Sequence, residues 1–429
     1  MHFPHLLQPK TTTYPVFSDI TNLWHLIIYQ FLEKANHLKV ISILKALKPK
    51  KQALYIKKEY ADSVMEKLIE DETFTEDERF TEDETGSFYS HLSEGCRLCQ
   101  EGAKMVLFVT GLCPKSCFYC PLSDGRRGKD LVFANERSVK KDDDLLKEAE
   151  LMNALGTGIT GGEPLLKIER VLHYIRMLKA SFGKEHHIHL YTSLAPDRQI
   201  LEKLADAGLD EIRLHPPQEC WKDLKNSPYA GTLKNAKELG IKAGIEIPAL
   251  EGADKVAAFA EEMGVFLNLN ELEFSDNNSR ALLKNGFCLE SDMSNAAAGS
   301  CKFANIAFQA CRKVHFCSST YKDAVQLRKR FQRIAKNTAR EFDEITEDGT
   351  LVYGIIEGGN QELAKETLQS MEIPAELFEI KAGKIEIAWW VLEELKEDIK
   401  EELEPSGSRL VIIERYPFED GLVVELIPL

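Results

Sequence analysis

Three cysteines directly follow a predicted strand. In the segment Gly111-Leu-Cys-Pro-Lys-Ser-Cys-Phe-Tyr-Cys-Pro121, the residues Cys113, Cys117 and Cys120 place three thiols within eight positions. Three neighbouring thiolates repel one another unless a cation shares their charge, so this spacing predicts a metal site. Iron–sulfur clusters are normally held by four thiolates, and a local set of three therefore predicts a cluster with one open iron position.

A glycine-rich motif follows one predicted βα unit later. The run Leu-Gly-Thr-Gly-Ile-Thr-Gly-Gly-Glu-Pro-Leu over residues 155–165 contains Gly161, Gly162, Glu163 and Pro164. Glycines lack a Cβ and let a ligand approach the backbone closely, while carbonyl and carboxylate oxygens accept hydrogen bonds from an ammonium group. Taken alone the motif fits a turn equally well; next to the cysteines it indicates an edge that binds an amino-acid cofactor.

Other cysteines leave alternatives open. Cys96 and Cys99 have the Cys-x2-Cys spacing of a structural zinc knuckle, so zinc completed by ligands from elsewhere is an alternative to iron. A second iron–sulfur cluster held by Cys96, Cys99 and Cys317 is a further hypothesis. Since no local four-cysteine motif supports it, ordinary buried thiols explain these residues as well.

Short apolar runs alternate with helical spacing from residue 95 onward, which predicts βα units around a parallel sheet. Helical spacing of Leu, Ile and Ala is clear in the stretches between them, such as Asp142–Leu155 and Arg198–Ala207. Six runs are expected to be strands: Met105–Thr110, Gly158–Gly161, His187–Ser193, Glu211–His215, Ala243–Pro248 and Phe266–Ser275. The expected fold class is α/β, a partial (βα)6 TIM-like barrel with its chemistry at the strand ends and a small C-terminal α/β domain.

The chain is expected to divide into an N-terminal extension over residues 1–94, a core over 95–320 and a C-terminal α/β domain over 321–429. The extension is first basic and then acidic, and its stretch Glu70–Glu84 reads as a charged surface linker. Within the last segment we expect five elements: a basic helix over about Lys322–Arg340, a helix near Gln361–Met371, and strands at Leu351–Ile356, Arg409–Glu414 and Gly421–Ile427.

Composition limits the classes of function. The net charge of −15 argues against broad, sequence-independent nucleic-acid binding. The basic helix is expected to present a solvated face, with RNA contact through residues 322–340 as the less favoured alternative. The apolar stretch Trp24–Phe31 is far shorter than the about 20 residues of a membrane span, and no signal peptide is evident, so we expect a cytoplasmic protein without membrane contact. Ten cysteines in a reducing compartment favour metal binding or catalysis over disulfides.

Together, Cys113-x3-Cys117-x2-Cys120 and Gly161-Gly-Glu-Pro164 resemble the motifs of the radical S-adenosylmethionine (radical SAM) superfamily, with a likeness that extends over the βα units. Within it the chain is most similar to an archaeal group related to the pyruvate formate-lyase activating enzyme. That narrower likeness lies in three phrases: Lys104-Met-Val-Leu-Phe-Val-Thr-Gly111, Val132-Phe-Ala-Asn-Glu-Arg137 and His315-Phe-Cys-Ser-Ser319.

The resemblance implies a site. The three cysteines would hold a [4Fe–4S] cluster whose open iron binds the amino and carboxylate groups of S-adenosylmethionine, and Gly161, Gly162 and Glu163, closed by Pro164, would receive the ammonium. Tyr119 would lie near the adenine. Polar residues at strand ends would bind the ribose and carboxylate, namely Arg213, His215, Glu246 and Asn270.

The resemblance also implies a reaction. A low-potential donor of the ferredoxin or flavodoxin type would reduce the cluster, and S-adenosylmethionine would be cleaved to methionine and a 5′-deoxyadenosyl radical that takes a hydrogen atom from a substrate. A protein substrate, as for an activase, is one hypothesis. The alternatives are radical modification of an RNA or a small metabolite and, outside the enzymes, a non-catalytic zinc-binding module.

Overall fold

A mostly parallel sheet forms the larger part of the chain that the computed structural model describes, residues 80–418 and 421–429. Its eleven strands run in the order β1-β2-β11-β10-β9-β8-β7-β6-β3-β4-β5. Seven of them are mutually parallel: β3 (Lys104–Phe108), β6 (Gly156–Thr160), β7 (His187–Thr192), β8 (Glu211–Leu214), β9 (Lys242–Pro248), β10 (Phe266–Asn270) and β11 (Val314–Cys317). The six predicted strands are confirmed, and β11, which the sequence analysis did not predict, is a seventh.

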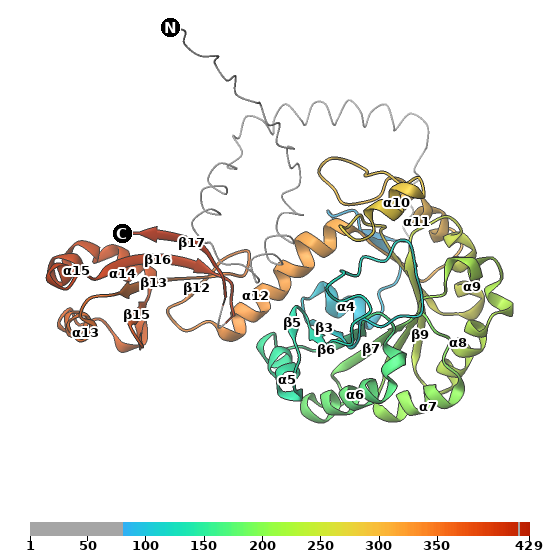
Figure 1. The fold of residues 1–429 in the computed structure, drawn as a ribbon, viewed down its shortest axis with the longest axis horizontal. Helices are drawn as coiled ribbons and strands as arrows, with labels where there is room; N and C mark the ends of the chain where they lie inside the picture. The colour runs from blue at the N-terminus through green and yellow to red at the C-terminus, as the bar shows by residue number, and fades with distance from the viewer. Residues whose placement is uncertain (1–79, 419–420) are drawn as a thin grey trace, which may run out of the picture. The chain divides into compact units, whose positions relative to one another are not determined.

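Helices cover the outer side of this curved sheet, as Figure 1 shows. They are α5 (Asp142–Leu151), α6 (Ile168–Phe182), α7 (Arg198–Ala207), α8 (Pro228–Glu238) and α9 (Ala253–Met263). Side chains alternate between the two faces of a strand. In β7, the fully buried Ile188 and Leu190 therefore lie on the face opposite His189. The apolar alternation that predicted the strands is the packing surface for these helices.

The short helix α4 (Glu94–Gln100) lies on the inner side of the sheet. A Cβ added to Gly95 would come within 2.6 Å of the His189 ring and 2.5 Å of an Arg213 nitrogen. Likewise, a Cβ on Gly156 of β6 would meet the Leu98 side chain at 2.6 Å. Glycine in both elements is what allows the helix to fit so closely into the barrel.

The N-terminal boundary of the barrel lies earlier than the sequence indicated. Residues of the expected extension form β1 (Thr81–Glu82) and β2 (Phe88–Tyr89), and β2 pairs antiparallel with β11. The ring of Phe88 stacks on that of Phe316 at 4.9 Å, so this strand contributes to the barrel core. The end of the expected acidic linker is thus part of the sheet. The earlier part of that linker and the basic N-terminal stretch before it lie outside the described residues.

The other edge of the sheet carries β4 (Phe133–Ala134) and β5 (Arg137–Ser138), which are antiparallel. Shorter elements of the barrel region are η1 (Pro164–Lys167), η2 (Gln218–Asn226), α10 (Ser279–Lys284) and α11 (Ser300–Phe308). None of the helices in the described part of the chain is long and apolar enough to span a membrane.

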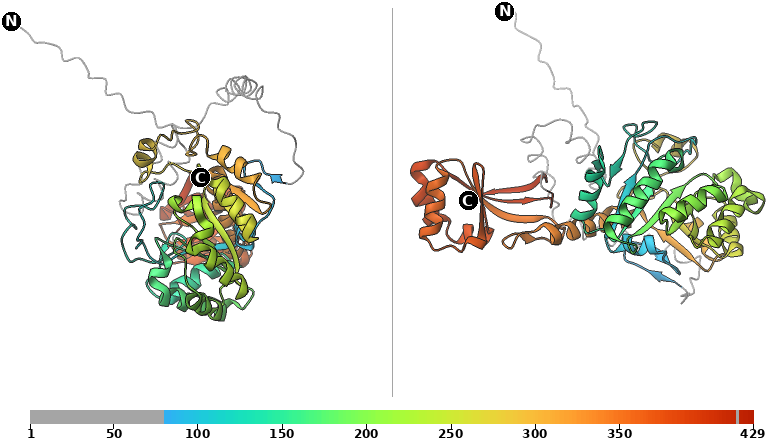
Figure 2. Two further views of the ribbon diagram at one scale, coloured as in Figure 1. Left: turned by 90° about the vertical axis from the view of Figure 1, so that its right-hand side faces the viewer. Right: turned by 90° about the horizontal axis from the view of Figure 1, so that it is seen from below.

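A separate antiparallel sheet forms the C-terminal region, drawn orange to red in Figure 2. Its strands are β12 (Glu344–Ile345), β13 (Leu351–Glu357), β14 (Phe378–Lys381), β15 (Lys384–Ile387), β16 (Arg409–Arg415) and β17 (Val423–Pro428). Its helical segments are α13 (Gln361–Ser370), η4 (Ala375–Leu377), α14 (Trp389–Glu394), α15 (Lys396–Leu403) and η5 (Glu404–Ser406). Ile356, Leu368, Leu392 and Leu403 share one core, so the helices pack on this sheet as expected of a mixed α/β domain.

The basic segment forms η3 (Tyr321–Gln326) and α12 (Leu327–Thr338). The expected solvated face is only partly correct, because Arg328, Lys329 and Lys336 are exposed but the other cations are engaged. Protein groups of the barrel and of the C-terminal region hold them: Lys322 by Glu273, Arg330 by Glu136, Arg333 by the carbonyl oxygens of Met152 and Asn153, and Arg340 by Asp343. The segment thus serves mainly internal contacts, which leaves few cations for RNA.

Candidate active site

The cysteines Cys113, Cys117 and Cys120, called here the mouth triad, lie in the loop between β3 and β4. Cys113 is exposed and the other two are partly exposed. The Cys120 amide donates to the Cys117 carbonyl oxygen at 3.1 Å, and the Lys115 amide donates to the Cys113 sulfur at 3.4 Å. Partial burial raises the pKa of Cys113, and Glu163 and the other two thiols raise that pKa further through their negative charge. The triad is thus a compact group of thiols near Glu163.

The glycine turn packs directly against the backbone that leads into the mouth triad. The Gly162 amide donates to the Thr110 carbonyl oxygen at 2.7 Å, and the Glu163 amide donates to that of Leu112 at 2.7 Å. A Cβ on Gly162 would stand 2.4 Å from the Leu112 oxygen, and one on Gly161 would stand 2.5 Å from the Thr110 oxygen. Only glycine permits this approach, so the two predicted motifs share one edge of the barrel.

The Glu163 carboxylate is fully buried and holds the turn to the end of β7. One oxygen accepts from the Thr192 hydroxyl at 2.6 Å and the Leu165 amide at 3.1 Å. The other accepts from the amide and the hydroxyl of Ser193 at 2.7 and 2.6 Å. Four donors satisfy this side chain. An ammonium contact at this turn would therefore fall to main-chain carbonyl oxygens rather than to the carboxylate.

Tyr119 and His215 form a hydrogen-bonded pair beside the mouth triad. The Tyr119 hydroxyl lies 2.9 Å from His215 Nε2, and His215 Nδ1 lies 2.8 Å from the Glu246 carbonyl oxygen. A carbonyl oxygen only accepts, so we assign the ring proton to Nδ1 and the donor role at Nε2 to the tyrosine. Burial lowers the pKa of His215, which keeps the ring neutral. The Tyr119 carbonyl oxygen is fixed by the Asn278 amide group at 3.0 Å.

The side chains of Arg213, Glu246 and Asn270 form a second hydrogen-bonded group in the barrel interior, next to the Glu246 carbonyl oxygen that contacts His215. Arg213 forms ion pairs with Glu246 at 2.7 Å and with Glu211 at 2.6 Å, and Asn270 donates to Glu246 at 2.9 Å. Burial alone would raise the pKa of Glu246, but Arg213 and the two asparagine donors, Asn270 and Asn268, hold it at about 2. The residues predicted to bind the ribose and carboxylate are thus divided, with His215 at the mouth and the other three inside.

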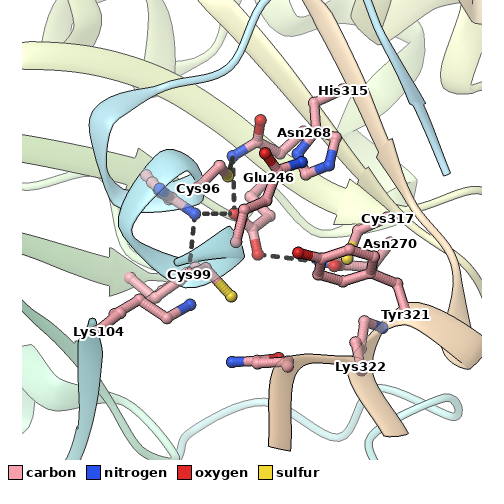
Figure 3. Close-up of a pocket in the computed structure, with 14 residues that line it drawn as sticks. Cys96, Cys99, Lys104, Glu246, Asn268, Asn270, His315, Cys317, Tyr321 and Lys322 are labelled. Carbon is pink, nitrogen blue, oxygen red and sulfur yellow. Dashed lines mark hydrogen bonds and ion pairs between the residues drawn. The ribbon is translucent and has the colours of Figure 1, made fainter. Parts of the chain in front are cut away.

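The interior residues line a cavity of about 180 Å³, drawn in Figure 3. It also contains Cys96, Cys99 and Cys317, called here the interior set, which the sequence analysis considered for a second cluster. Burial would raise the pKa of Cys96, but Arg213 and His315 lower it to about 7. Burial raises the pKa of Cys317. The remaining lining residues include Lys104, Tyr191, Asn268, Tyr321 and Lys322.

Comparison with known proteins decides the family. The model of the radical SAM superfamily matches residues 107–255, which include the mouth triad and the glycine turn. A protein of Methanocaldococcus jannaschii, provisionally named a glycyl-radical enzyme activating enzyme, is 39% identical over 353 residues, or 80% of this chain and 94% of that protein. The chain belongs to the radical SAM superfamily. Membership makes it an enzyme and implies a [4Fe–4S] cluster and S-adenosylmethionine as cofactors.

Two further likenesses of this radical SAM enzyme are more limited. Residues 349–429 match a domain of unknown function. The solved structure of a radical SAM methyltransferase from Kitasatospora setae, with cobalamin and a [4Fe–4S] cluster bound, is 11% identical with a TM-score of 0.31. That match covers 71% of this chain and 61% of the methyltransferase chain.

The mouth of this radical SAM enzyme offers a donor set that suits an iron–sulfur cluster. A cubane binds each thiolate through a different iron, so its ligands stand further apart than four ligands around zinc. Three thiols on one accessible loop beside open glycine backbone suit that geometry. Membership in an enzyme family also removes the support for a non-catalytic zinc module.

Some site residues of the radical SAM enzyme were not predicted. Thr192 and Ser193 end a predicted strand, and two adjacent hydroxyls at a strand end could have indicated the partner of Glu163. Asn278, which fixes the Tyr119 backbone, carried no signal in the sequence. Lys104 and Lys322 line the interior cavity, but neither was predicted as a site residue. Lys322 had been assigned to the predicted basic helix.

Proposed function

We propose that this radical SAM enzyme activates a partner protein by abstracting a hydrogen atom from a glycine in its backbone. The support is the relative whose provisional name describes an activating enzyme of glycyl-radical enzymes, together with the length of the match, 94% of that protein. The sequence analysis considered a protein substrate, and this proposal specifies the reacting group as a backbone glycine. Radical modification of an RNA or a small metabolite becomes an outcome that the experiment below can reveal.

In this proposal the mouth triad holds three irons of the [4Fe–4S] cluster. When bound, the cluster passes one electron from a ferredoxin- or flavodoxin-type donor to S-adenosylmethionine, whose S–C5′ bond breaks to give methionine and a 5′-deoxyadenosyl radical. Transfer of a hydrogen atom from the glycine Cα to this radical gives 5′-deoxyadenosine and leaves a glycyl radical on the partner protein. The observation that carries the assignment is the backbone contact between the triad loop and the glycine turn.

The surrounding side chains position the cofactor without reacting. The main chain of Gly161 and Gly162 offers carbonyl oxygens to an ammonium group, and Glu163 keeps the turn in place through its four donors. Tyr119, held by His215, presents its ring beside the triad loop. Because the His215 ring is neutral, it adds no positive charge next to a sulfonium cation.

The exposure of the mouth supports a macromolecular substrate. Residues 113–116 and 127–131 of the triad loop are exposed, so a segment of another protein can approach the cysteines without prior opening of the barrel. All ten cysteines are free thiols, which accords with the reducing, cytoplasmic setting that this proposal includes.

The test follows a hydrogen isotope. Soluble extract from host cells grown with α-dideuterated glycine supplies the unknown partner. It is mixed anaerobically with the reduced enzyme and S-adenosylmethionine, and 5′-deoxyadenosine is analysed by mass spectrometry. We expect deuterium in the 5′-deoxyadenosine and a carbon-centred radical signal in the protein fraction. The Cys113→Ala variant, which lacks one cluster ligand, should give neither.

Other labels decide among the alternatives. Unlabelled 5′-deoxyadenosine from this extract would contradict the activase proposal, provided that the product forms at the same rate as with unlabelled cells. Deuterium appearing instead from labelled nucleosides would identify RNA as the substrate. Deuterium transfer from the low-molecular-mass fraction alone would identify a metabolite.

A further inference from the structure

The interior set comes from two elements far apart in the sequence. Cys96 and Cys99 lie one turn apart on α4, and residues three apart share one face of a helix. Cys317 ends β11, where it pairs in register with Asn270 of β10. All three cysteines line the same cavity, and Figure 3 shows their side chains around it. Folding therefore gathers three thiols on the inner side of the sheet, around one cavity that the mouth triad does not line.

Three cations line the same cavity as the interior set, namely Lys104, Arg213 and Lys322. Arg213 and Lys322 pair with carboxylates, namely Glu211, Glu246 and Glu273. Among the described residues, Lys104 has no carboxylate partner. Its half-buried ammonium group is therefore available to a negatively charged group in the cavity.

Two polar atoms on the cavity lining also lack partners. Asn268 and His315 are 3% and 6% exposed, and within the described structure neither Asn268 Oδ1 nor His315 Nδ1 has a hydrogen-bond partner. Asn268 does use its amide nitrogen, which donates to Glu246 at 3.0 Å and lies 3.4 Å from the Cys96 sulfur. Buried polar atoms are normally paired, so the cavity is built for an occupant with polar groups of its own.

The identity of the occupant follows from the thiols. The interior set has as many cysteines as the mouth triad, which belongs to a superfamily that binds a cubane. Thiolates that bind different corners of a cubane fit the interior set equally well, and its inorganic sulfides accept hydrogen bonds from nearby donors such as ammonium groups. We propose that Cys96, Cys99 and Cys317 hold a second [4Fe–4S] cluster in this cavity, with one iron lacking a cysteine ligand.

This proposal requires iron at both cysteine sets and does not depend on the identity of the substrate. Two full-length variants separate the sets. The mouth-minus variant carries Cys113→Ala, Cys117→Ala and Cys120→Ala, and the interior-minus variant carries Cys99→Ala and Cys317→Ala. Cys220→Ala serves as the control, because Cys220 belongs to neither cysteine set and does not line the interior cavity. Each protein is loaded anaerobically with iron and sulfide, and both elements are then quantified per chain.

We expect about eight irons and eight sulfides in the wild-type and control proteins and about four of each in both variants, since each site holds one cubane. In the reduced interior-minus variant, S-adenosylmethionine should change the electron paramagnetic resonance spectrum of the remaining cluster. In the mouth-minus variant it should leave the spectrum unchanged. That contrast assigns the two clusters to the two sets without any measurement of activity.

The mouth-minus variant is decisive by itself, because its interior set is intact. Absence of iron and sulfide from this protein, with about four irons in the wild type, would overturn the proposal. Zinc in place of iron would assign the interior set to a different metal. If this protein instead holds no metal and its mass is two units lower than that of the fully reduced chain, a disulfide has formed, and Cys96 and Cys99 would be assigned as a redox dithiol. If the interior-minus variant fails to fold by circular dichroism, the mouth-minus result still decides.

Discussion

The mouth triad and the interior set are two groups of three cysteines in different environments. The mouth triad lies on one loop, and its cysteines are exposed or partly exposed; partial burial and the charge of Glu163 raise the pKa of Cys113. The interior set comes from a helix and a strand, includes the buried Cys96, and lines a cavity together with Lys104, Arg213 and Lys322. The site on the exposed loop suits exchange of a cofactor and contact with a substrate, whereas the site on the inner side of the sheet suits a group that remains bound.

The largest expected effect separates the two sets by function. Cys113→Ala should lower the rate of S-adenosylmethionine cleavage by at least about 1000-fold, because it removes a ligand of the cluster that performs the chemistry. Cys317→Ala should keep that rate within about tenfold, because it leaves the mouth unchanged. Release of 5′-deoxyadenosine under anaerobic reduction measures both. An equal loss in the two variants would mean that the sets act as one site.

A second prediction concerns the charges around the interior set. Arg213→Met should lower the free energy of unfolding by about 3 to 5 kcal/mol, because Glu211 and Glu246 would remain buried without their cation. Denaturant titration of the metal-free protein measures this change. Arg198→Met is the matched control, since Arg198 pairs with Glu202 and Glu238 at the surface and should show no measurable change. Similar values for both variants would contradict the interior ion-pair network.

A third prediction tests the close contact at the mouth. Gly162→Ala places a methyl group 2.4 Å from the Leu112 oxygen and should destabilise the protein by about 1 to 3 kcal/mol. Displacement of the turn should also slow S-adenosylmethionine cleavage by about 10- to 100-fold. Gly231→Ala in α8 meets nothing within 4 Å and should stabilise the protein by up to about 1 kcal/mol. A tolerated Gly162→Ala would show that the two motifs do not touch.

The smallest expected effect concerns Tyr119. Tyr119→Phe removes the hydroxyl that donates to His215 but keeps the ring, and should cost about 1 kcal/mol of stability. His215→Gln keeps a side chain that can accept at the same place, and we expect about half of that loss. Thermal unfolding of the two variants provides the comparison. A larger effect of His215→Gln than of Tyr119→Phe would show that the imidazole has another role.

The local features of this chain could be predicted from its sequence. The mouth triad, the glycine turn and the six strands follow from spacing over a few residues, and the structure contains each of them. The strands β1 and β2 gave little signal, since two residues cannot establish a period, and β11 was not predicted although it is as long as β8. Their place in the sheet depends on pairing with distant segments.

Non-local features were harder to predict. Arg213 and Glu246 read as polar residues at strand ends, and nothing in the sequence shows that they pair with each other inside the barrel. Likewise, the cations of α12 looked solvated until their partners in other segments were known. The hypothesis of a second cluster grouped Cys317 with Cys96 and Cys99, but only the fold shows that the three residues line one cavity.

The central claim is that the mouth cluster binds S-adenosylmethionine, and its most direct test determines which of the two clusters contacts this cofactor. Cofactor labelled with ¹⁵N at its amino group is added to the reduced interior-minus variant, and electron–nuclear double resonance is recorded. We expect a strong nitrogen coupling, because the open iron of the mouth cluster binds that amino group. No coupling in this variant, with a clear coupling in the mouth-minus variant, would place the cofactor at the interior set and contradict the account.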